Sequence, residues 1–164
     1  GSGCIAVATL VHRPDVTADA LELYPNTLAL ATENAARGGV SARFTPIKGD
    51  LLGNGVDLLS SRAPYDAILS NPPYIPTRDI ETLDIEVRQE PLMALDGGDD
   101  GLDFYRTIPR TFRSVLAPGG TLAFEVGIGQ CYSVMDILER EGYKNIRSKN
   151  DLCGIERVVM GSVE

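Results

Sequence analysis

The segment that most constrains the fold is Asn71-Pro72-Pro73-Tyr74-Ile75, which directly follows the apolar run at residues 65–70. The run has the composition of a strand, and the two consecutive prolines after it forbid both helix and ladder pairing. The side chain of Asn71 and the carbonyl of Pro72 are therefore expected at the carboxyl edge of that strand. This edge is where open α/β sheets bind their ligands.

Such a corner is suited to holding a planar NH2 group. An amide or exocyclic amine nitrogen is a poor nucleophile because its lone pair is delocalised, and both of its hydrogens need acceptors in a dry pocket. Asn71 Oδ1 and the Pro72 carbonyl can supply both acceptors, while the ring of Tyr74 can lie against the flat group and exclude water. We therefore predict catalysis by positioning, without a strong general base. An ordinary turn is the alternative, since Asn and Pro are common turn residues.

A second site signal lies at the start of the sequence, in Gly1-Ser2-Gly3. A glycine turn of this type normally joins a strand to a helix, so we expect the first strand to precede these glycines in a longer protein. Residues 4–11 are apolar on nearly every side and are predicted to form a helix buried between a sheet and its neighbours. Residues 16–23 are predicted to form a strand that ends near Glu22, about 20 residues past the glycines. An acid at that place accepts hydrogen bonds from ribose hydroxyls; the alternative is a solvated surface glutamate.

A third strand, predicted at residues 42–48, is followed by Asp50 and Leu51. An acid at this strand end is well placed to accept a hydrogen bond from an adenine amine, with Leu51 packing on the ring. An Asx-turn explains Asp50 equally well. The only histidine, His12, is predicted to be a surface residue at a helix end rather than a ligand or base.

The rest of the sequence alternates strands and helices after an irregular stretch, residues 75–100, which is predicted to be a loop over the site. The later elements are predicted at residues 101–115 (helix), 121–126 (strand), 130–141 (helix), 143–149 (strand) and 156–161 (strand). We predict one α/β domain spanning residues 1–164. Its sheet is expected to be doubly wound, mostly parallel and Rossmann-like, with a C-terminal antiparallel hairpin.

Charge and cysteine content narrow the classes of function. The 164 residues carry a formal net charge of −8, which argues against the broad basic surface of a nucleic-acid-binding protein. The three cysteines are odd in number and lack metal-ligand spacing, so we predict a reducing compartment and no metal site. Apolar runs are too short to span a bilayer, so no membrane partner is expected.

Together, these motifs resemble the HemK/PrmC family of protein-(glutamine-N5) methyltransferases. The resemblance covers nearly the whole sequence. It rests on Gly1-Ser2-Gly3-Cys4-Ile5-Ala6, Asn71-Pro72-Pro73-Tyr74-Ile75, Glu86-Val87-Arg88, Glu90-Pro91, Ala94-Leu95-Asp96-Gly97-Gly98, and Asp151-Leu152-Cys153-Gly154 with Arg157. The Asn-Pro-Pro-Tyr element is shared with amine methyltransferases acting on DNA or RNA bases, whereas the Glu-Pro and Leu-Asp-Gly-Gly segments narrow the match.

The resemblance implies a class I methyltransferase fold and, before it, a small helical substrate-binding domain that residues 1–164 do not include. It implies S-adenosyl-L-methionine as cofactor and S-adenosyl-L-homocysteine as product. The implied reaction methylates the side-chain amide of the glutamine in the Gly-Gly-Gln motif of class 1 peptide chain release factors, which modulates translation termination. The implied partner is the release factor, and the implied compartment is the bacterial cytoplasm or, in a eukaryote, the mitochondrion.

The resemblance also implies roles for the residues already singled out. Cofactor contacts would come from Gly1, Ser2 and Gly3 in the loop, from Glu22 at the ribose, and from Asp50 and Leu51 at the adenine. Asn71 would contact both the cofactor and the target amide. Pro72, Pro73 and Tyr74 would complete the substrate grip, and Asn71, Pro72 and Tyr74 would be the catalytic residues.

Two other functions are compatible with the sequence. The same corner can bind the exocyclic amine of a DNA or RNA base, which requires a flipped base and gives a steep salt dependence of binding. A non-catalytic nucleoside-binding or assembly subunit would retain the fold without binding S-adenosyl-L-methionine. The acidic composition argues against the first function, and the intact segment at residues 71–74 argues against the second.

Overall fold

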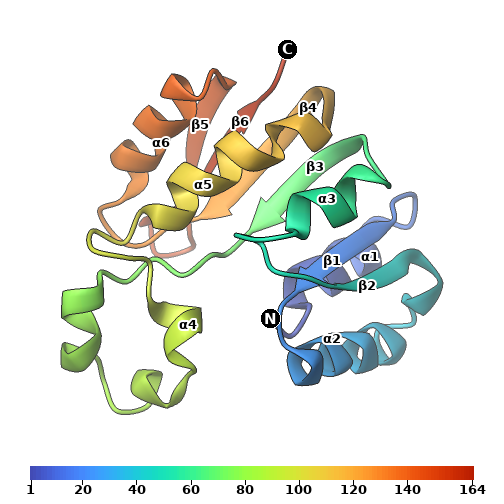
Figure 1. Cartoon of the computed structure of the whole chain (residues 1–164), viewed down its shortest axis with the longest axis horizontal. Helices are drawn as coiled ribbons and strands as arrows, with labels where there is room; N and C mark the ends of the chain where they lie inside the picture. Colours follow the sequence, from blue (N-terminus) through green and yellow to red (C-terminus); the bar gives the residue numbers. More distant parts are fainter. The chain divides into compact units, whose positions relative to one another are not determined.

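The computed structural model describes residues 1–164, which form two compact units, Gly1–Arg62 and Ala63–Glu164 (Figure 1). The first unit contains a two-stranded sheet and the second contains a four-stranded sheet. Strands and helices alternate along each unit, as the sequence predicts. No helix combines the length and the apolar content that crossing a membrane requires.

The first unit is built around two parallel strands. Its elements are α1 (Cys4–His12), β1 (Ala18–Glu22), α2 (Pro25–Arg37), the 3₁₀ turn η1 (Ser41–Arg43), β2 (Phe44–Lys48) and α3 (Gly55–Ser60). Ala18 pairs with Phe44 at one end of the ladder, and Glu22 pairs with Lys48 at the other. Pro25 occupies the first turn of α2, where its missing N–H costs no helical hydrogen bond. The strand predicted at residues 42–48 begins only at Phe44, because η1 precedes it.

The core of the first unit shows how α1 packs. Leu10 is the one buried residue of α1, while Ile5 and Val11 are 38% and 51% exposed. The prediction of a helix buried between the sheet and its neighbours is therefore wrong. A helix that packs on one side of a small sheet buries a stripe rather than its whole circumference. The other buried core residues of this unit are Ala31, Ala35, Val40 and Phe44.

The second unit has a mixed sheet in the order β3-β4-β6-β5. Its elements are β3 (Tyr65–Ser70), η2 (Thr77–Thr82), η3 (Val87–Gln89), α4 (Leu92–Leu95), α5 (Asp103–Phe112), η4 (Arg113–Val115), β4 (Leu116–Glu125), α6 (Cys131–Arg140), β5 (Lys144–Asn150) and β6 (Glu156–Ser162). β3 and β4 are parallel, whereas β6 runs antiparallel to both β4 and β5. The α/β class with parallel strand pairs and a C-terminal antiparallel hairpin is confirmed.

The core of the second unit forms where α5 packs on β4. Tyr105, Ile108 and Phe112 are almost fully buried, as their helical spacing predicts. The Tyr105 ring meets the Phe124 ring edge to face, with centroids 5.2 Å apart. The Tyr105 hydroxyl donates a hydrogen bond of 2.8 Å to the carbonyl of Glu125. Burial raises the pKa of Tyr105, and nearby Tyr74 adds to this shift, so the hydroxyl stays protonated and holds the carboxyl end of β4.

Candidate functional site

The glycine loop (residues 1–3) leads into α1 of the first unit. Gly3 has a φ of 75°, a left-handed conformation that favours glycine. A Cβ atom at this position would also lie 2.9 Å from the Cβ of Ala31, which is closer than carbon atoms approach. Both the backbone angle and the close approach of α2 therefore require glycine here.

Glu22 lies beside this loop, at the carboxyl end of β1. Its side chain is only 12% exposed, and its Oε2 lies against the backbone nitrogen of Gly1. Its other oxygen, Oε1, accepts a hydrogen bond of 2.8 Å from the Tyr24 backbone N–H. The glycines and Glu22, which stand about 20 residues apart in the sequence, are thus in contact in the structure. Glu22 is not a solvated surface residue; its contact with a ribose stays a prediction.

Asn34 supports the glycine loop and was not identified from the sequence. Its Nδ2 donates a hydrogen bond of 3.0 Å to the carbonyl of Ser2. The available signal was its place in α2, because Asn34 lies three residues after the buried Ala31, on the same face of the helix. A polar residue on a buried helix face needs a hydrogen-bond partner. The hydrogen-bond partner of Asn34 is the Ser2 carbonyl in the glycine loop, the candidate cofactor loop.

Asp50 and Leu51 follow β2, next to the end of β1. The Gly49 N–H donates a hydrogen bond of 3.0 Å to the Glu22 carbonyl, which brings the two strand ends together. Asp50 Oδ1 accepts a hydrogen bond of 2.9 Å from the Leu52 N–H, so the Asx-turn foreseen as one explanation of Asp50 is present. Asp50 is exposed and Leu51 is half-buried. Their contacts with an adenine stay a prediction.

The Asn-Pro-Pro-Tyr turn (residues 71–74) follows β3 in the second unit, where Ser70 pairs with Phe124 of β4. Asn71 is exposed, and its amide makes no hydrogen bond within the chain. Pro72 is buried, and its carbonyl likewise accepts no hydrogen bond. The two oxygens assigned to a planar NH2 group are therefore not engaged by other groups of the protein. Tyr74 is half-buried.

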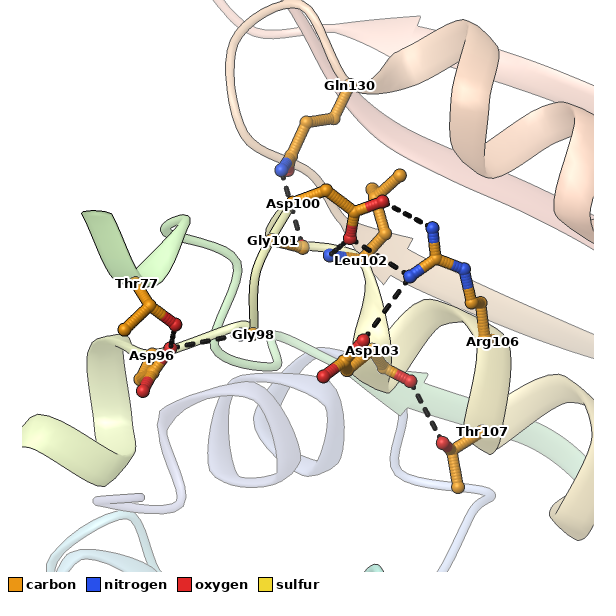
Figure 2. Close-up of polar contacts among 10 residues, drawn as sticks. All are labelled: Thr77, Asp96, Gly98, Asp100, Gly101, Leu102, Asp103, Arg106, Thr107 and Gln130. Carbon is orange, nitrogen blue, oxygen red and sulfur yellow. Dashed lines mark hydrogen bonds and ion pairs between the residues drawn. The ribbon is translucent and has the colours of Figure 1, made fainter. Parts of the chain in front are cut away.

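The chain leaving this turn pairs with the Leu-Asp-Gly-Gly segment (residues 95–98). The Ile75 N–H donates to the carbonyl of Leu95 at 3.0 Å, and the Gly97 N–H donates to the carbonyl of Ile75 at 2.9 Å. Asp96 accepts hydrogen bonds from the Thr77 hydroxyl at 2.7 Å and from the Gly98 N–H at 3.0 Å (Figure 2). Two motifs that are far apart in the sequence thus form one structure. This pairing was not predicted from the sequence.

Glycines and one glutamine enclose Tyr74. A Cβ atom at Gly97 would lie 2.8 Å from Tyr74 Cα, and one at Gly101 would collide with the Tyr74 carbonyl oxygen. That carbonyl accepts a hydrogen bond of 2.9 Å from Nε2 of Gln130. From the sequence, Gln130 was predicted only as the start of a helix. The available signal was the Gly127-Ile-Gly-Gln130 loop between a strand and a helix.

The terminal motif forms the tip of the β5–β6 hairpin. Asp151 Oδ1 accepts hydrogen bonds from the N–H groups of Cys153 at 2.8 Å and Ile155 at 3.0 Å. Arg157 lies with Nε 3.7 Å from Asp151 Oδ2, and its Nη1 donates to the carbonyl of Val126 at 3.4 Å. The hairpin tip is thereby tied to the residue that follows β4.

The predicted site residues fall into two groups, one in each unit. The first group is Gly1, Ser2, Gly3, Glu22, Asp50 and Leu51, and the second is Asn71, Pro72, Pro73 and Tyr74. Within its own unit, each group gathers at the carboxyl ends of parallel strands, where α/β sheets bind ligands. A separate cavity of about 510 Å³ lies beside α6 and β5, and none of the predicted site residues lines it.

Solved structures show which fold this is. The hMettl16 catalytic domain in complex with the MAT2A 3′UTR hairpin 6 aligns with a TM-score of 0.72 and 14% identity, over 100% of this chain and 62% of that chain. The protein-(glutamine-N5) methyltransferase (release factor-specific) from Alicyclobacillus acidocaldarius aligns with a TM-score of 0.53 and 22% identity, over 100% and 93%. The fold is that of the class I methyltransferases.

Curated proteins of one name match this sequence along nearly its whole length. The release factor glutamine methyltransferase of Geobacter sulfurreducens is 46% identical over 99% of this chain and 55% of its own length. Further bacterial proteins of the same name match at 35–44% identity over at least 96% of the chain. The chain is thus similar to release factor glutamine methyltransferases along nearly its whole length, and no family model matches it. It spans about half the length of the curated relatives it matches.

Proposed function

We propose that this protein methylates the side-chain amide of a glutamine in a class 1 peptide chain release factor, with S-adenosyl-L-methionine as methyl donor. The names of its relatives support this substrate. The observation that carries the chemistry is the unengaged pair of acceptors, Asn71 Oδ1 and the Pro72 carbonyl, at the carboxyl end of β3. We place the reaction in the bacterial cytoplasm, since the relatives are bacterial.

The residues of the first unit fit an adenosyl cofactor. The carboxylate of Glu22, beside the glycine loop, suits the paired hydroxyls of a ribose. Asp50 keeps one carboxylate oxygen outside its Asx-turn for an adenine amine, and Leu51 offers an apolar surface beside it. When bound, S-adenosyl-L-methionine supplies an electrophilic methyl group on a positively charged sulfur, which suits a protein with a net charge of −8.

The Asn-Pro-Pro-Tyr turn would prepare the amide as nucleophile. Asn71 Oδ1 and the Pro72 carbonyl would each accept one hydrogen of the NH2 group, which directs the nitrogen lone pair away from the turn. The prolines make the backbone stiff, so this geometry is set before the substrate arrives. The Tyr74 ring would lie against the flat amide and exclude water. Positioning and electrostatic stabilisation then lower the barrier, and the proton that the nitrogen loses as it takes the methyl group passes to solvent without a strong general base.

The test replaces Asn71 with alanine in the protein expressed from its complete gene. We expect Asn71→Ala to lower methylation of a release-factor Gly-Gly-Gln peptide at least 100-fold, because the amide loses one of its two acceptors. Affinity for S-adenosyl-L-methionine, measured by calorimetry, should stay within about tenfold, or roughly 1.4 kcal/mol. Mass spectrometry of the peptide after incubation with labelled cofactor measures the transfer.

Asn150→Ala is the matched control, since Asn150 is an exposed asparagine whose amide bonds only to the Gly154 carbonyl. It should keep the activity of the unmodified protein. Near-normal turnover by Asn71→Ala would contradict the proposal. Methyl transfer to an oligonucleotide rather than to the peptide would replace it with the alternative reaction on a base amine.

A further inference from the structure

Gln130, the residue that precedes α6, connects three backbone segments of the second unit. Its Nε2 donates hydrogen bonds to the carbonyls of Tyr74 at 2.9 Å and Gly101 at 3.3 Å. Its Oε1 accepts a hydrogen bond of 3.0 Å from the Gly127 N–H. Figure 2 shows the side chain reaching from the loop before α6 to Gly101. One side chain therefore joins the Asn-Pro-Pro-Tyr turn to two segments that are distant in the sequence.

The chemistry of the three partners fixes how the Gln130 amide is oriented. Gly127 N–H can only donate, and the two carbonyls can only accept. A rotation of the amide by 180° would place oxygen against both carbonyls and NH2 against an N–H, losing every hydrogen bond. A Cβ atom at Gly127 would lie 2.6 Å from Gln130 Oε1, so the loop is also shaped around this side chain. The amide has one arrangement that satisfies all its partners.

The position of Tyr74 makes this contact relevant to the candidate site. Tyr74 is the last residue of the Asn-Pro-Pro-Tyr turn, and the next residue, Ile75, is held by the Leu-Asp-Gly-Gly segment. Gly101 is held in turn by its neighbour Asp100, which pairs with Arg106 and accepts a hydrogen bond of 3.1 Å from the Leu102 N–H (Figure 2). Gln130 thus links the carbonyl of Tyr74 to the carbonyl of Gly101, whose neighbours are held by these hydrogen bonds.

We propose that Gln130 is a positioning residue, which fixes the Asn-Pro-Pro-Tyr turn so that Asn71 and Pro72 present their oxygens correctly to the substrate amide. This inference rests on the proposed function for its effect on turnover. The hydrogen bonds that carry it do not depend on the substrate. Gln130 itself contacts neither the substrate nor the cofactor in this scheme.

Two substitutions test the donors and the acceptor of the Gln130 amide. Gln130→Glu retains an oxygen for the Gly127 N–H but loses both donors and places a carboxylate against the carbonyls of Tyr74 and Gly101. Gln130→Met has a similar length and loses all three hydrogen bonds without adding charge. We expect kcat for the release-factor peptide to fall about tenfold in Gln130→Met and about 100-fold in Gln130→Glu. Affinity for S-adenosyl-L-methionine should stay within about threefold in both variants.

A matched control and a second measurement distinguish positioning from general stability. Gln89→Met replaces an exposed glutamine that makes no side-chain hydrogen bond, and it should leave kcat unchanged. Hydrogen exchange followed by mass spectrometry should show faster exchange at residues 71–77 in both Gln130 variants, while exchange in β5 and β6 stays as in the unmodified protein. This readout requires no substrate.

The possible results separate the two proposals. If the unmodified protein fails to methylate the peptide, the proposed function is wrong, and faster exchange at residues 71–77 in the variants still supports the connection made by Gln130. If the unmodified protein is active and both variants retain kcat within about twofold, the positioning role is overturned. A loss of global stability with unchanged kcat per folded molecule would also overturn it.

Discussion

The two units hold their candidate site residues by different means. In the first unit, the glycine loop is held by Asn34 of α2 and lies beside Glu22 at the end of β1. In the second unit, the Asn-Pro-Pro-Tyr turn is stiffened by its own prolines and held by the Leu-Asp-Gly-Gly segment and by Gln130. The comparison teaches that a local signal marks each group, whereas in both units the residues that hold the group are distant from it in the sequence.

The largest expected effect tests the long-range support of the second group. Gly101 has a φ of 76°, and a Cβ atom there would collide with the Tyr74 carbonyl oxygen. Gly101→Ala should lower the free energy of unfolding by about 3 kcal/mol, from backbone strain and overpacking together. Methylation of the release-factor peptide by the folded fraction should fall about 100-fold, because Tyr74 must move. Urea unfolding and single-turnover assays measure the two effects.

The matched control for that prediction is Gly119→Ala. Gly119 has a φ of 77°, but no atom lies within 4 Å of its hypothetical Cβ. Its cost should be backbone strain alone, about 1 kcal/mol, with turnover unchanged. Equal losses of stability and activity in the two variants would show that contact with Tyr74 contributes nothing.

The next effect tests the first unit. Glu22→Gln removes the charge that faces the glycine loop while it preserves the shape of the side chain. We expect affinity for S-adenosyl-L-methionine to weaken about tenfold, or roughly 1.4 kcal/mol, because a charged acceptor becomes neutral. Calorimetry provides the measurement. Glu33→Gln, which breaks only an exposed pair with Arg37, should bind the cofactor normally; a weakening as large as that of Glu22→Gln would refute the ribose assignment.

The smallest effect concerns the support of the glycine loop. Asn34→Ala removes one hydrogen bond to the Ser2 carbonyl, so affinity for S-adenosyl-L-methionine should weaken about threefold. Thr32→Ala is the control, because its hydroxyl bonds only to the Leu28 carbonyl within α2. Titration of each variant by calorimetry decides the outcome. Unchanged affinity in Asn34→Ala would mean that this hydrogen bond does not hold the loop in its binding geometry.

The predictions from sequence succeeded where the signal is local. The double proline ends β3 at Ser70, and the short turn at residues 151–155 joins β5 and β6 into the predicted antiparallel hairpin. The stripe containing Tyr105 and Ile108 is buried, as its spacing predicts. The prediction for α1 failed because an apolar composition does not say how many faces of a helix find a partner.

By itself, the sequence determined where strands end and which residues stand there, because proline geometry, glycine conformation and hydrophobic spacing act within a few residues. Glu22 and Asn71 were therefore placed at strand ends by local patterns alone. Only the tertiary structure decided that Ile75 pairs with the segment at residues 95–98 and that Gln130 binds the Tyr74 carbonyl. Those contacts join residues far apart in the chain, and hydrogen bonds between such residues form only when packing brings their atoms within reach.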